Sequence, residues 1–288
     1  MAAVGDPAPA DLVVQGEDID TPALKALARL AGARDIVALT RAATQAFRLS
    51  GSERRDAVAG FCLEAGFDFA FVPRDRRLER VRLVAFDMDS TLITIECIDE
   101  IADMQGIKAA VAEVTASAMR GEIDFRQSLQ RRVALLAGLP IGALQRVYDE
   151  RLALSPGAER MVAGFRQAGA RTLLVSGGFS FFTERLKSRL GIDYALAGAL
   201  ETADGRLTGR VSGEIVDGAA KAAAFAPLRE ELRGGDGLAL AIGDGANDLP
   251  MLRLADVSVA YHAKPVVRAE ATHAIDHSGL DAILNLFA

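Results

Sequence analysis

The chain carries its strongest strand pattern at Val81-Arg82-Leu83-Val84-Ala85-Phe86, and Asp87-Met88-Asp89-Ser90-Thr91 follows directly. The nearly continuous apolar run is typical of a strand that is buried on both faces of a sheet. Asp87 and Asp89 come at the point where such a strand leaves the sheet. An isolated pair of this kind is often a simple turn, so the ends of the other strands decide whether it marks a functional site.

Similar apolar runs occur further along the chain, with helical patterns between them, at Arg171 to Val175, Leu238 to Ile242 and Val257 to Ala260. This alternation predicts an α/β fold with a doubly wound, mostly parallel sheet. Residues 100–154 have almost wholly helical patterns, which predicts a helical cap inserted after the first strand. Sheets of this class place functional groups at the carboxyl ends of their strands.

Local patterns predict several further elements. A helix before the second strand places four apolar residues on one face and has Gly169 near its end; the four are Ala158, Met161, Val162 and Phe165. Asp204-Gly205 indicates a hairpin turn. A last helix is expected from Leu280 to Phe287, with Ser278 and Asp281 in capping-box spacing.

The residues before the strand at Val81–Phe86 have a different pattern of predicted elements. Residues 11–73 show the element order β-α-β-β-α-β, which is typical of a small ferredoxin-like or ACT-like α+β module. Arg74 to Arg80 has no apolar period and predicts a linker. We therefore expect an N-terminal module at residues 1–79 and a larger domain at residues 80–288, with the cap at about 100–154.

Composition excludes several classes of protein. The 288 residues include 33 Lys and Arg against 39 Asp and Glu, a net charge of −6, so nucleic acid is not expected as a partner. The first residues lack the pattern of a secretion signal, and no apolar run is long enough to span a membrane. The two cysteines, Cys62 and Cys97, have no pairing framework. These features predict a soluble, cytoplasmic protein without membrane contact.

Two other predicted strands end in residues suited to binding phosphate and a metal. Ser176-Gly177-Gly178 follows the second strand, and Gly243-Asp244-Gly245-Ala246-Asn247-Asp248 follows the third. Lys221 stands alone in an apolar helical stretch between them. Four carboxylates in one crevice raise each other's pKa values unless a cation compensates. Oxygen ligands favour Mg²⁺, and a metal, an ammonium and backbone N–H groups together suit a phosphoryl group.

Each of these features also has a plainer interpretation. Lys221 by itself would be a solvated helix residue, and Ser176-Gly177-Gly178 a turn. His273 and His277 lie four residues apart, but they lack the His-Glu-x-x-His order, so a solvated or locally hydrogen-bonded pair is favoured over a metal site. Neither cysteine has an arginine six positions on, as Cys-x5-Arg phosphatase chemistry requires.

Together, the four motifs resemble those of the haloacid dehalogenase superfamily in order and spacing, and residues 81–288 resemble its phosphoserine phosphatase family. The resemblance implies Mg²⁺-dependent hydrolysis of O-phospho-L-serine through an aspartyl phosphate, the last step of serine biosynthesis. It implies that Asp87 is the nucleophile and a metal ligand, and that Asp89 is the acid and base, with its carbonyl on the metal. Asp244 would be the third ligand, supported by Asp248.

The same resemblance assigns the substrate contacts. Ser176, Gly177, Lys221 and Asn247 would hold the phosphate. In the cap, Met119 and Phe125 stand where the family has substrate contacts, with Glu96 facing the ammonium and Arg132 the carboxylate of phosphoserine. Two alternatives stay open: a phosphatase for another small phosphomonoester such as phosphohomoserine, and an amino-acid sensor or homodimeric assembly unit that carries a vestigial enzyme.

Overall fold

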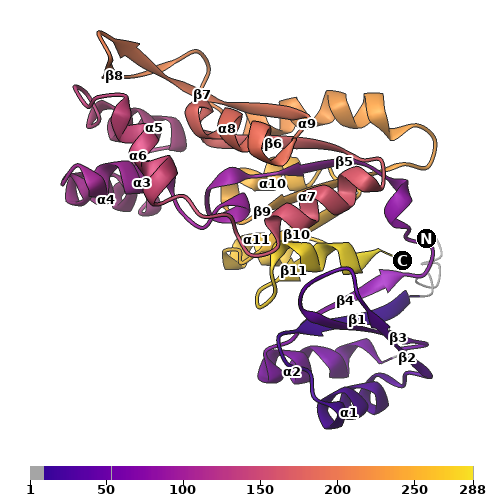
Figure 1. Ribbon diagram of the computed structural model, residues 1–288. Coiled ribbons are helices and arrows are strands. Elements are labelled where there is room, and N and C mark those ends of the chain that lie inside the picture. The colour runs from indigo at the N-terminus through magenta and orange to yellow at the C-terminus, as the bar shows by residue number, and fades with distance from the viewer. Residues whose placement is uncertain (1–9, 53, 288) are drawn as a thin grey trace, which may run out of the picture.

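The computed structural model describes residues 10–52 and 54–287, in which the chain forms two sheets (Figure 1). The first residues, where no secretion signal is predicted, lie outside this part. The larger sheet has the order β11-β10-β9-β5-β6-β7-β8. Its strands are β5 (Val81–Phe86), β6 (Arg171–Phe179), β7 (Tyr194–Ala203), β8 (Arg206–Ser212), β9 (Leu238–Gly243), β10 (Val257–Tyr261) and β11 (His273–Ile275).

The sheet is mostly parallel, as predicted: every neighbouring pair is parallel except β7 and β8. The central strand β5 alternates between two cores, because Val84 and Phe86 join one apolar cluster while Leu83 and Ala85 join the other. A strand buried on both faces needs apolar residues at successive positions. The apolar run therefore predicts the central strand correctly.

Helices cover both faces of this sheet, which confirms the doubly wound arrangement. They are α7 (Ala158–Gln167), α8 (Ser180–Leu190), α9 (Gly218–Arg233), α10 (Leu249–Leu252) and α11 (Pro265–Glu270). Phe165 of α7 and Phe182 of α8 pack on one face, and Phe225 of α9 packs on the other. The four apolar residues predicted to form one face of α7 are all buried.

A helical cap follows β5, in the predicted region. After a short turn, η2 (Met88–Leu92), it comprises α3 (Cys97–Met104), α4 (Lys108–Met119), α5 (Phe125–Ala134) and α6 (Gly142–Glu150). An antiparallel bridge between Ile93 and Leu154 closes its base. Figure 1 shows the cap at the left, beside the hairpin of β7 and β8. The hairpin turns at Asp204 and Gly205, both with positive φ, as the Asp-Gly pair predicts.

The smaller sheet has the order β2-β3-β1-β4 with antiparallel neighbours. Its elements confirm the predicted β-α-β-β-α-β order: β1 (Ala10–Gly16), α1 (Thr21–Ala31), β2 (Asp35–Leu39), β3 (Gln45–Ser50), α2 (Arg55–Ala65) and β4 (Asp68–Pro73). One face packs against α1 and α2. On the other face Val13, Ala70 and Val72 belong to the same apolar cluster as the larger sheet.

The segment predicted as a linker is held in place. It ends in a short helix, η1 (Leu78–Arg80). Arg76 Nη1 lies 2.6 Å from Nε2 of His273, and Arg80 pairs with Asp236 at 3.1 Å. Nearby, Asp68 of β4 accepts hydrogen bonds from the backbone N–H groups of three residues beyond β11, namely Asp276, His277 and Ser278. These bonds join the smaller sheet to the larger one.

The structure corrects two expectations. Strand β6 continues to Phe179 instead of ending at Val175, with an irregularity between Ser176 and Phe179. The last helix, η4 (Leu280–Leu286), is a 3-10 helix capped by Gly279, so the predicted capping box is wrong. Asp281 instead accepts hydrogen bonds from the backbone N–H of Ala43 at 2.8 Å and from Arg160. These tertiary contacts take the place of the predicted local bond to Ser278. Among the described residues, no helix is long and apolar enough to cross a membrane.

Candidate active site

The carboxyl end of β5 and helix α9 together form a buried ionic cluster. Nζ of Lys221 lies 2.7 Å from Oδ1 of Asp87 and 2.7 Å from Oδ1 of Asp248. Burial and the nearby Asp248 raise the pKa of Asp87, against the opposing effect of Lys221. Burial by itself lowers the pKa of Lys221, but the two carboxylates reverse this and keep it charged. The apolar helix therefore carries a lysine that is buried and paired, and not solvated.

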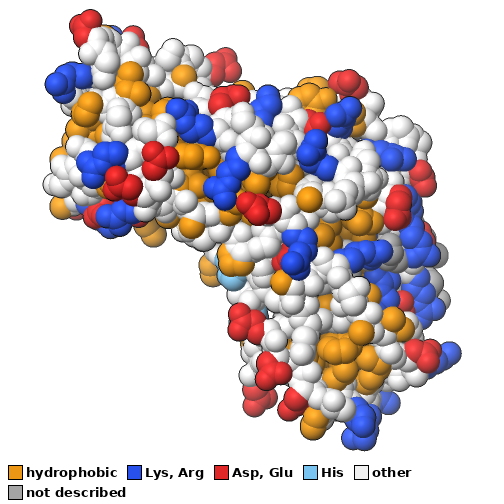
Figure 2. Space-filling model, in the orientation of Figure 1, with side chains coloured by type: hydrophobic (Ala, Val, Ile, Leu, Met, Phe, Trp, Pro, Cys, Tyr) orange, Lys and Arg blue, Asp and Glu red, His pale blue; other side chains and the backbone are white. Residues whose placement is uncertain are grey.

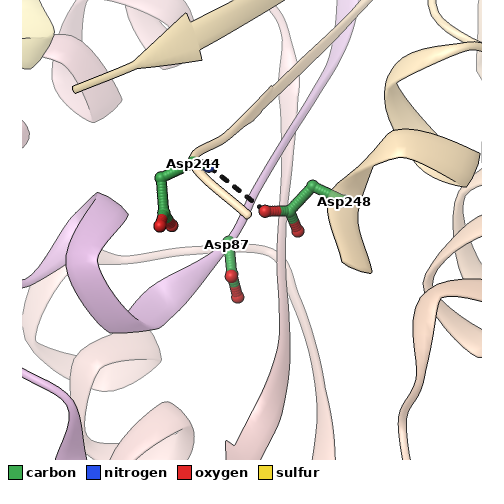
Figure 3. Close-up of side chains that lie close together, drawn as sticks. All are labelled: Asp87, Asp244 and Asp248. Atoms are coloured by element: carbon green, nitrogen blue, oxygen red, sulfur yellow. Dashed lines mark hydrogen bonds between the residues drawn. The ribbon is translucent and has the colours of Figure 1, made fainter. Parts of the chain in front are cut away.

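Three carboxylates meet at this sheet edge (Figure 3). Oxygens of Asp87, Asp244 and Asp248 all lie within 4.8 Å of one another and could hold a metal ion. Thr91 Oγ1 donates to Asp244 at 2.9 Å, and Asp248 accepts from the backbone N–H groups of Asp244 and Gly245. A set of oxygen donors with this spacing suits a hard divalent cation.

Asp89 is held beside this cluster by two neighbours. The backbone N–H of Cys97 donates to Oδ1 of Asp89 at 2.9 Å, and Ser176 Oγ lies 3.4 Å from Oδ2. Burial raises the pKa of Asp89. A Cβ added to Gly178 would lie 2.7 Å from Oδ2 of Asp89, so only glycine allows β6 to approach this closely.

The chain turns sharply after Asp89. Ser90 adopts a left-handed φ of 56°, and its Oγ donates to Oε1 of Glu96 at 2.9 Å. Burial and the charge of Asp89 raise the pKa of Glu96 to about 7. A non-glycine residue with this φ is uncommon and is found mainly where the surrounding structure holds it. The turn directs Glu96 into the space below the cap.

The cap and the sheet edge enclose a cavity of about 700 Å³. It is lined by nine of the residues that the sequence singled out: Asp87, Asp89, Glu96, Met119, Phe125, Arg132, Gly177, Asp244 and Asn247. Ser176, Lys221 and Asp248 are buried behind it. Nε of Arg132 is buried without a hydrogen-bond partner, whereas Met119 is 82% exposed at the rim. The residues come from β6, from the segments that follow β5 and β9, and from the cap.

The sequence motifs do not include a lysine that lines the cavity. Lys264 lines the cavity, its backbone N–H donates to the carbonyl of Asp244 at 3.0 Å, and its charge counteracts the pKa increase that burial causes in Asp244. It follows the end of β10, the fourth predicted strand, whose carboxyl end carries none of the four sequence motifs. The rule that strand ends meet at one sheet edge would have found it.

The remaining candidates lie elsewhere. His273 belongs to β11 and contacts Arg76, which is distant in the sequence, so its hydrogen bond is a tertiary contact and not the local one that was predicted. Both cysteines are free and buried. Burial raises the pKa of Cys62 to about 12, and burial with the nearby Asp89 raises that of Cys97, so neither thiol is suited to act as a nucleophile.

Comparisons with known proteins show which family this chain belongs to. Residues 84–253 match the model of the haloacid dehalogenase-like hydrolases, and residues 12–58 match a domain of unknown function. A phosphoserine phosphatase of Polaromonas is 52% identical over 217 residues, 74% of this chain and 92% of that protein. About a quarter of this chain therefore has no counterpart in that relative.

Solved structures extend the similarity to the whole chain. A probable phosphoserine phosphatase from Vibrio cholerae, solved unliganded, is 34% identical with a TM-score of 0.83, covering 98% of this chain and 88% of that one. A phospho-aspartyl intermediate analogue of phosphoserine phosphatase is 37% identical with a TM-score of 0.66, covering 72% of this chain and 99% of that one. This chain therefore belongs to the phosphoserine phosphatase family of the haloacid dehalogenase-like hydrolases.

Proposed function

We propose that this protein hydrolyses O-phospho-L-serine to L-serine and phosphate, with Asp87 as the nucleophile. The observation that carries the proposal is the position of Asp87. It lines a cavity of substrate size while its Oδ1 lies 2.7 Å from the buried ammonium of Lys221. A carboxylate held beside a cation, at the edge where a phosphate can enter, is placed to attack phosphorus.

In the first step, an oxygen of Asp87 forms a bond to phosphorus and the bond between phosphorus and the serine oxygen breaks. Asp89 gives its proton to that oxygen, and serine leaves. Burial raises the pKa of Asp89, which favours the protonated form needed at this point. The bonds from Cys97 and Ser176 hold its two oxygens in fixed directions.

In the second step, water hydrolyses the aspartyl phosphate. Asp89, now ionised, takes a proton from the water, whose oxygen bonds to phosphorus while the bond to Asp87 breaks. Free phosphate and the carboxylate of Asp87 result. Ser176, Gly177, Lys221 and Asn247 are proposed to hold the phosphoryl oxygens through both steps, because phosphoryl transfer needs mainly positioning and charge compensation.

The donor set also fits Mg²⁺. Asp87, Asp244 and the backbone carbonyl of Asp89 would hold the ion, and Asp248 would support this arrangement through its bonds to Lys221 and to the backbone of Asp244. The bound ion would neutralise charge on the phosphoryl oxygens. The oxygen-only character of the cluster supports this choice over zinc, which prefers nitrogen and sulfur ligands.

The cap supplies the proposed specificity for an amino acid. Glu96 would face the ammonium of phosphoserine and Arg132 its carboxylate. Arg132 has a buried Nε without a hydrogen-bond partner at the wall of the cavity, and a substrate carboxylate would satisfy it. A phosphomonoester without these two charged groups would leave that nitrogen unpaired, which favours phosphoserine over a generic substrate.

We also propose the domain division and cellular setting that the sequence predicts. Residues 1–79 would form an ACT-like module, and residues 80–288 the phosphatase domain with its cap at about 100–154. The separate sheets support this division. The small, soluble substrate and the two free cysteines support a cytoplasmic location. A homodimer is the assembly that sedimentation of the full chain would test.

The decisive experiment compares Asp87→Asn with the wild type. Wild-type enzyme quenched with acid during turnover of phosphorus-labelled phosphoserine should retain protein-bound label that alkali releases. The Asn variant should retain none and should turn over no substrate while keeping its circular dichroism spectrum. Asp99→Asn, the same change in another residue lining the cavity, serves as the control and should keep labelling. Turnover by Asp87→Asn would refute the assignment.

A further inference from the structure

A second pocket lies where the smaller sheet meets the segment leading to β5. Its volume is about 490 Å³. It is lined by residues of β1, β2, β3, the loop after β2 and the linker: Asp11, Ala38, Leu39, Thr40, Arg41, Arg48, Arg74 and Arg77. None of these residues lines the cavity below the cap. The linker enters β5 at its amino end, whereas Asp87 follows its carboxyl end, so the two pockets lie at opposite ends of this strand.

This pocket is strongly basic in an acidic protein. Four arginines and one aspartate line it, a local charge of +3, while the whole chain carries −6. Asp11 is engaged by Arg74, at 2.8 Å. Figure 2 shows Lys and Arg side chains gathered along the right side of the molecule, over the joint between the sheets. Four cations held together with a single carboxylate repel one another, and this repulsion opposes folding of the unliganded protein.

The other three arginines form no salt bridge within the part of the chain that the structure describes. Within residues 10–52 and 54–287, no carboxylate forms a salt bridge with Arg41, Arg48 or Arg77. Arg41 donates to the carbonyl of Phe287 and Arg77 to that of Arg74, both neutral acceptors. Their remaining donor groups bind no other acceptor among the described residues, so an anion in the pocket could be held by them.

Arg48 gives the strongest indication of a ligand. Its neighbours Phe47 and Leu49 pack toward α1 and α2, so alternation along β3 directs Arg48 to the opposite face, next to Val13. There, Nη2 is buried and has no hydrogen-bond partner. Burial lowers the pKa of Arg48, as do the charges of Arg41 and Arg77, while Asp11 opposes the shift. A buried donor of a charged group is normally paired.

We propose that this pocket binds the phosphate group of a small anion, either inorganic phosphate or a phosphorylated metabolite. The planar guanidinium groups present paired N–H donors that match phosphate oxygens. A dianion would offset most of the local charge of +3 and would satisfy Nη2 of Arg48. Because Arg74 and Arg77 belong to the linker and Arg48 to the smaller sheet, the bound anion would tie these segments together and stabilise the folded protein.

Calorimetric titration of the full-length protein tests this proposal. Inorganic phosphate and glycerol 2-phosphate are titrated, in chelator, into wild type, Arg48→Met and Arg77→Met. Phosphate binding at the cavity below the cap contributes the same heat in all three proteins, because neither arginine lines that cavity. We expect the affinity for phosphate to fall tenfold or more in each variant. This is about the effect of losing one hydrogen bond to a charged group. If glycerol 2-phosphate binds more tightly than inorganic phosphate, the pocket is a site for a phosphorylated metabolite. If inorganic phosphate binds more tightly, the pocket is a site for the free ion.

Three measurements control the result. Arg189→Met, an exposed arginine on α8, should bind phosphate as the wild type does. Phosphatase activity of Arg48→Met should be unchanged, which separates this pocket from the catalytic one whatever the substrate is. Arg77 is exposed, so Arg77→Met keeps the test valid if Arg48→Met does not fold. Equal binding by wild type and variants, or tighter binding of citrate than of either phosphate, would overturn the proposal.

Discussion

Nζ of Lys221 lies 2.7 Å from Oδ1 of Asp87, and both residues are buried. The pair joins α9 to the end of β5 across the sheet edge, and Asp248 completes it from the other side. The arrangement both orients the proposed nucleophile and prevents the accumulation of unpaired buried charge. Stability and activity are therefore coupled at this lysine.

Lys221→Met should be strongly destabilising, because it leaves Asp87 and Asp248 without their shared cation. Removing one partner of a buried pair costs about 3 to 5 kcal/mol in the free energy of unfolding. Chemical denaturation in chelator measures it, with Lys25→Met, an exposed lysine of α1, as the control. Adding Asp248→Asn to Lys221→Met should restore part of the loss. A Lys221→Met protein as stable as the wild type would contradict this account.

Magnesium should stabilise the folded protein through the three carboxylates. At a hundred times its dissociation constant, a ligand that binds only the folded state adds about 2.7 kcal/mol. The unfolding temperature should rise with Mg²⁺ and fall again with chelator, in parallel with activity. Asp244→Asn should lose most of the response, whereas Asp99→Asn should keep it. Full activity in excess chelator would exclude the proposed cofactor.

Arg132→Met and Glu96→Gln should weaken phosphoserine binding selectively. Each loses a contact to a charged group of the substrate, about 1.5 to 3 kcal/mol, so KM for phosphoserine should rise roughly tenfold or more. KM for an aryl phosphate, which lacks both groups, should change little. Arg131→Met, the exposed neighbour on α5, is the matched control. If KM rises equally for both substrates, these residues stabilise the structure of the cap and do not recognise the amino acid.

His273 should make the protein sensitive to acid. Burial and Arg76 lower its pKa to about 3, whereas the unfolded chain has a value near 6.5. Between these values the unfolded state binds the proton and the folded state does not, so stability falls as pH drops below about 6.5 and levels off near 3. The slope is at most about 1.4 kcal/mol per pH unit, reduced by the partial exposure of the ring.

Denaturation curves measured between pH 7 and 4 test whether the free energy of unfolding falls as the pH falls. His273→Gln should flatten the dependence of the free energy of unfolding on pH in this range, because glutamine does not titrate. His277→Gln, at an exposed position nearby, should leave the slope unchanged. If both variants keep the slope of the wild type, another group causes the acid sensitivity.

A protein that begins at residue 80 should remain soluble and keep phosphatase activity, because every proposed catalytic residue lies beyond Val81. It should unfold at a lower temperature, since it loses the apolar contacts of Val13, Ala70 and Val72 and the four backbone bonds to Asp68. Activity, calorimetry and sedimentation compare it with the full chain. A folded, metal-bound but inactive product would mean that residues 1–79 complete the active site.

The sequence by itself determined the main strands of the sheet, the cap and nine residues of the cavity wall. Apolar runs such as Val81–Phe86 reflect burial on both faces, a local property that periodicity records. Because parallel strands end at one edge, residues at or just beyond their carboxyl ends, such as Asp87, Gly177 and Asp244, lie close together. The Asp-Gly turn at 204 and the element order of the smaller sheet were also predictable, because short-range conformational preferences determine both.

Only the tertiary structure decided which distant side chains pair. Nothing local indicates that Arg48 faces Arg41 and Arg77, or that His273 contacts Arg76, because these residues come from separate elements whose docking depends on the whole apolar core. The capping box at Ser278 was predicted and is absent, since Asp281 reaches Ala43 across the joint between the sheets instead. The pairing of side chains from distant elements is set by tertiary packing, which residue spacing within one element does not reveal.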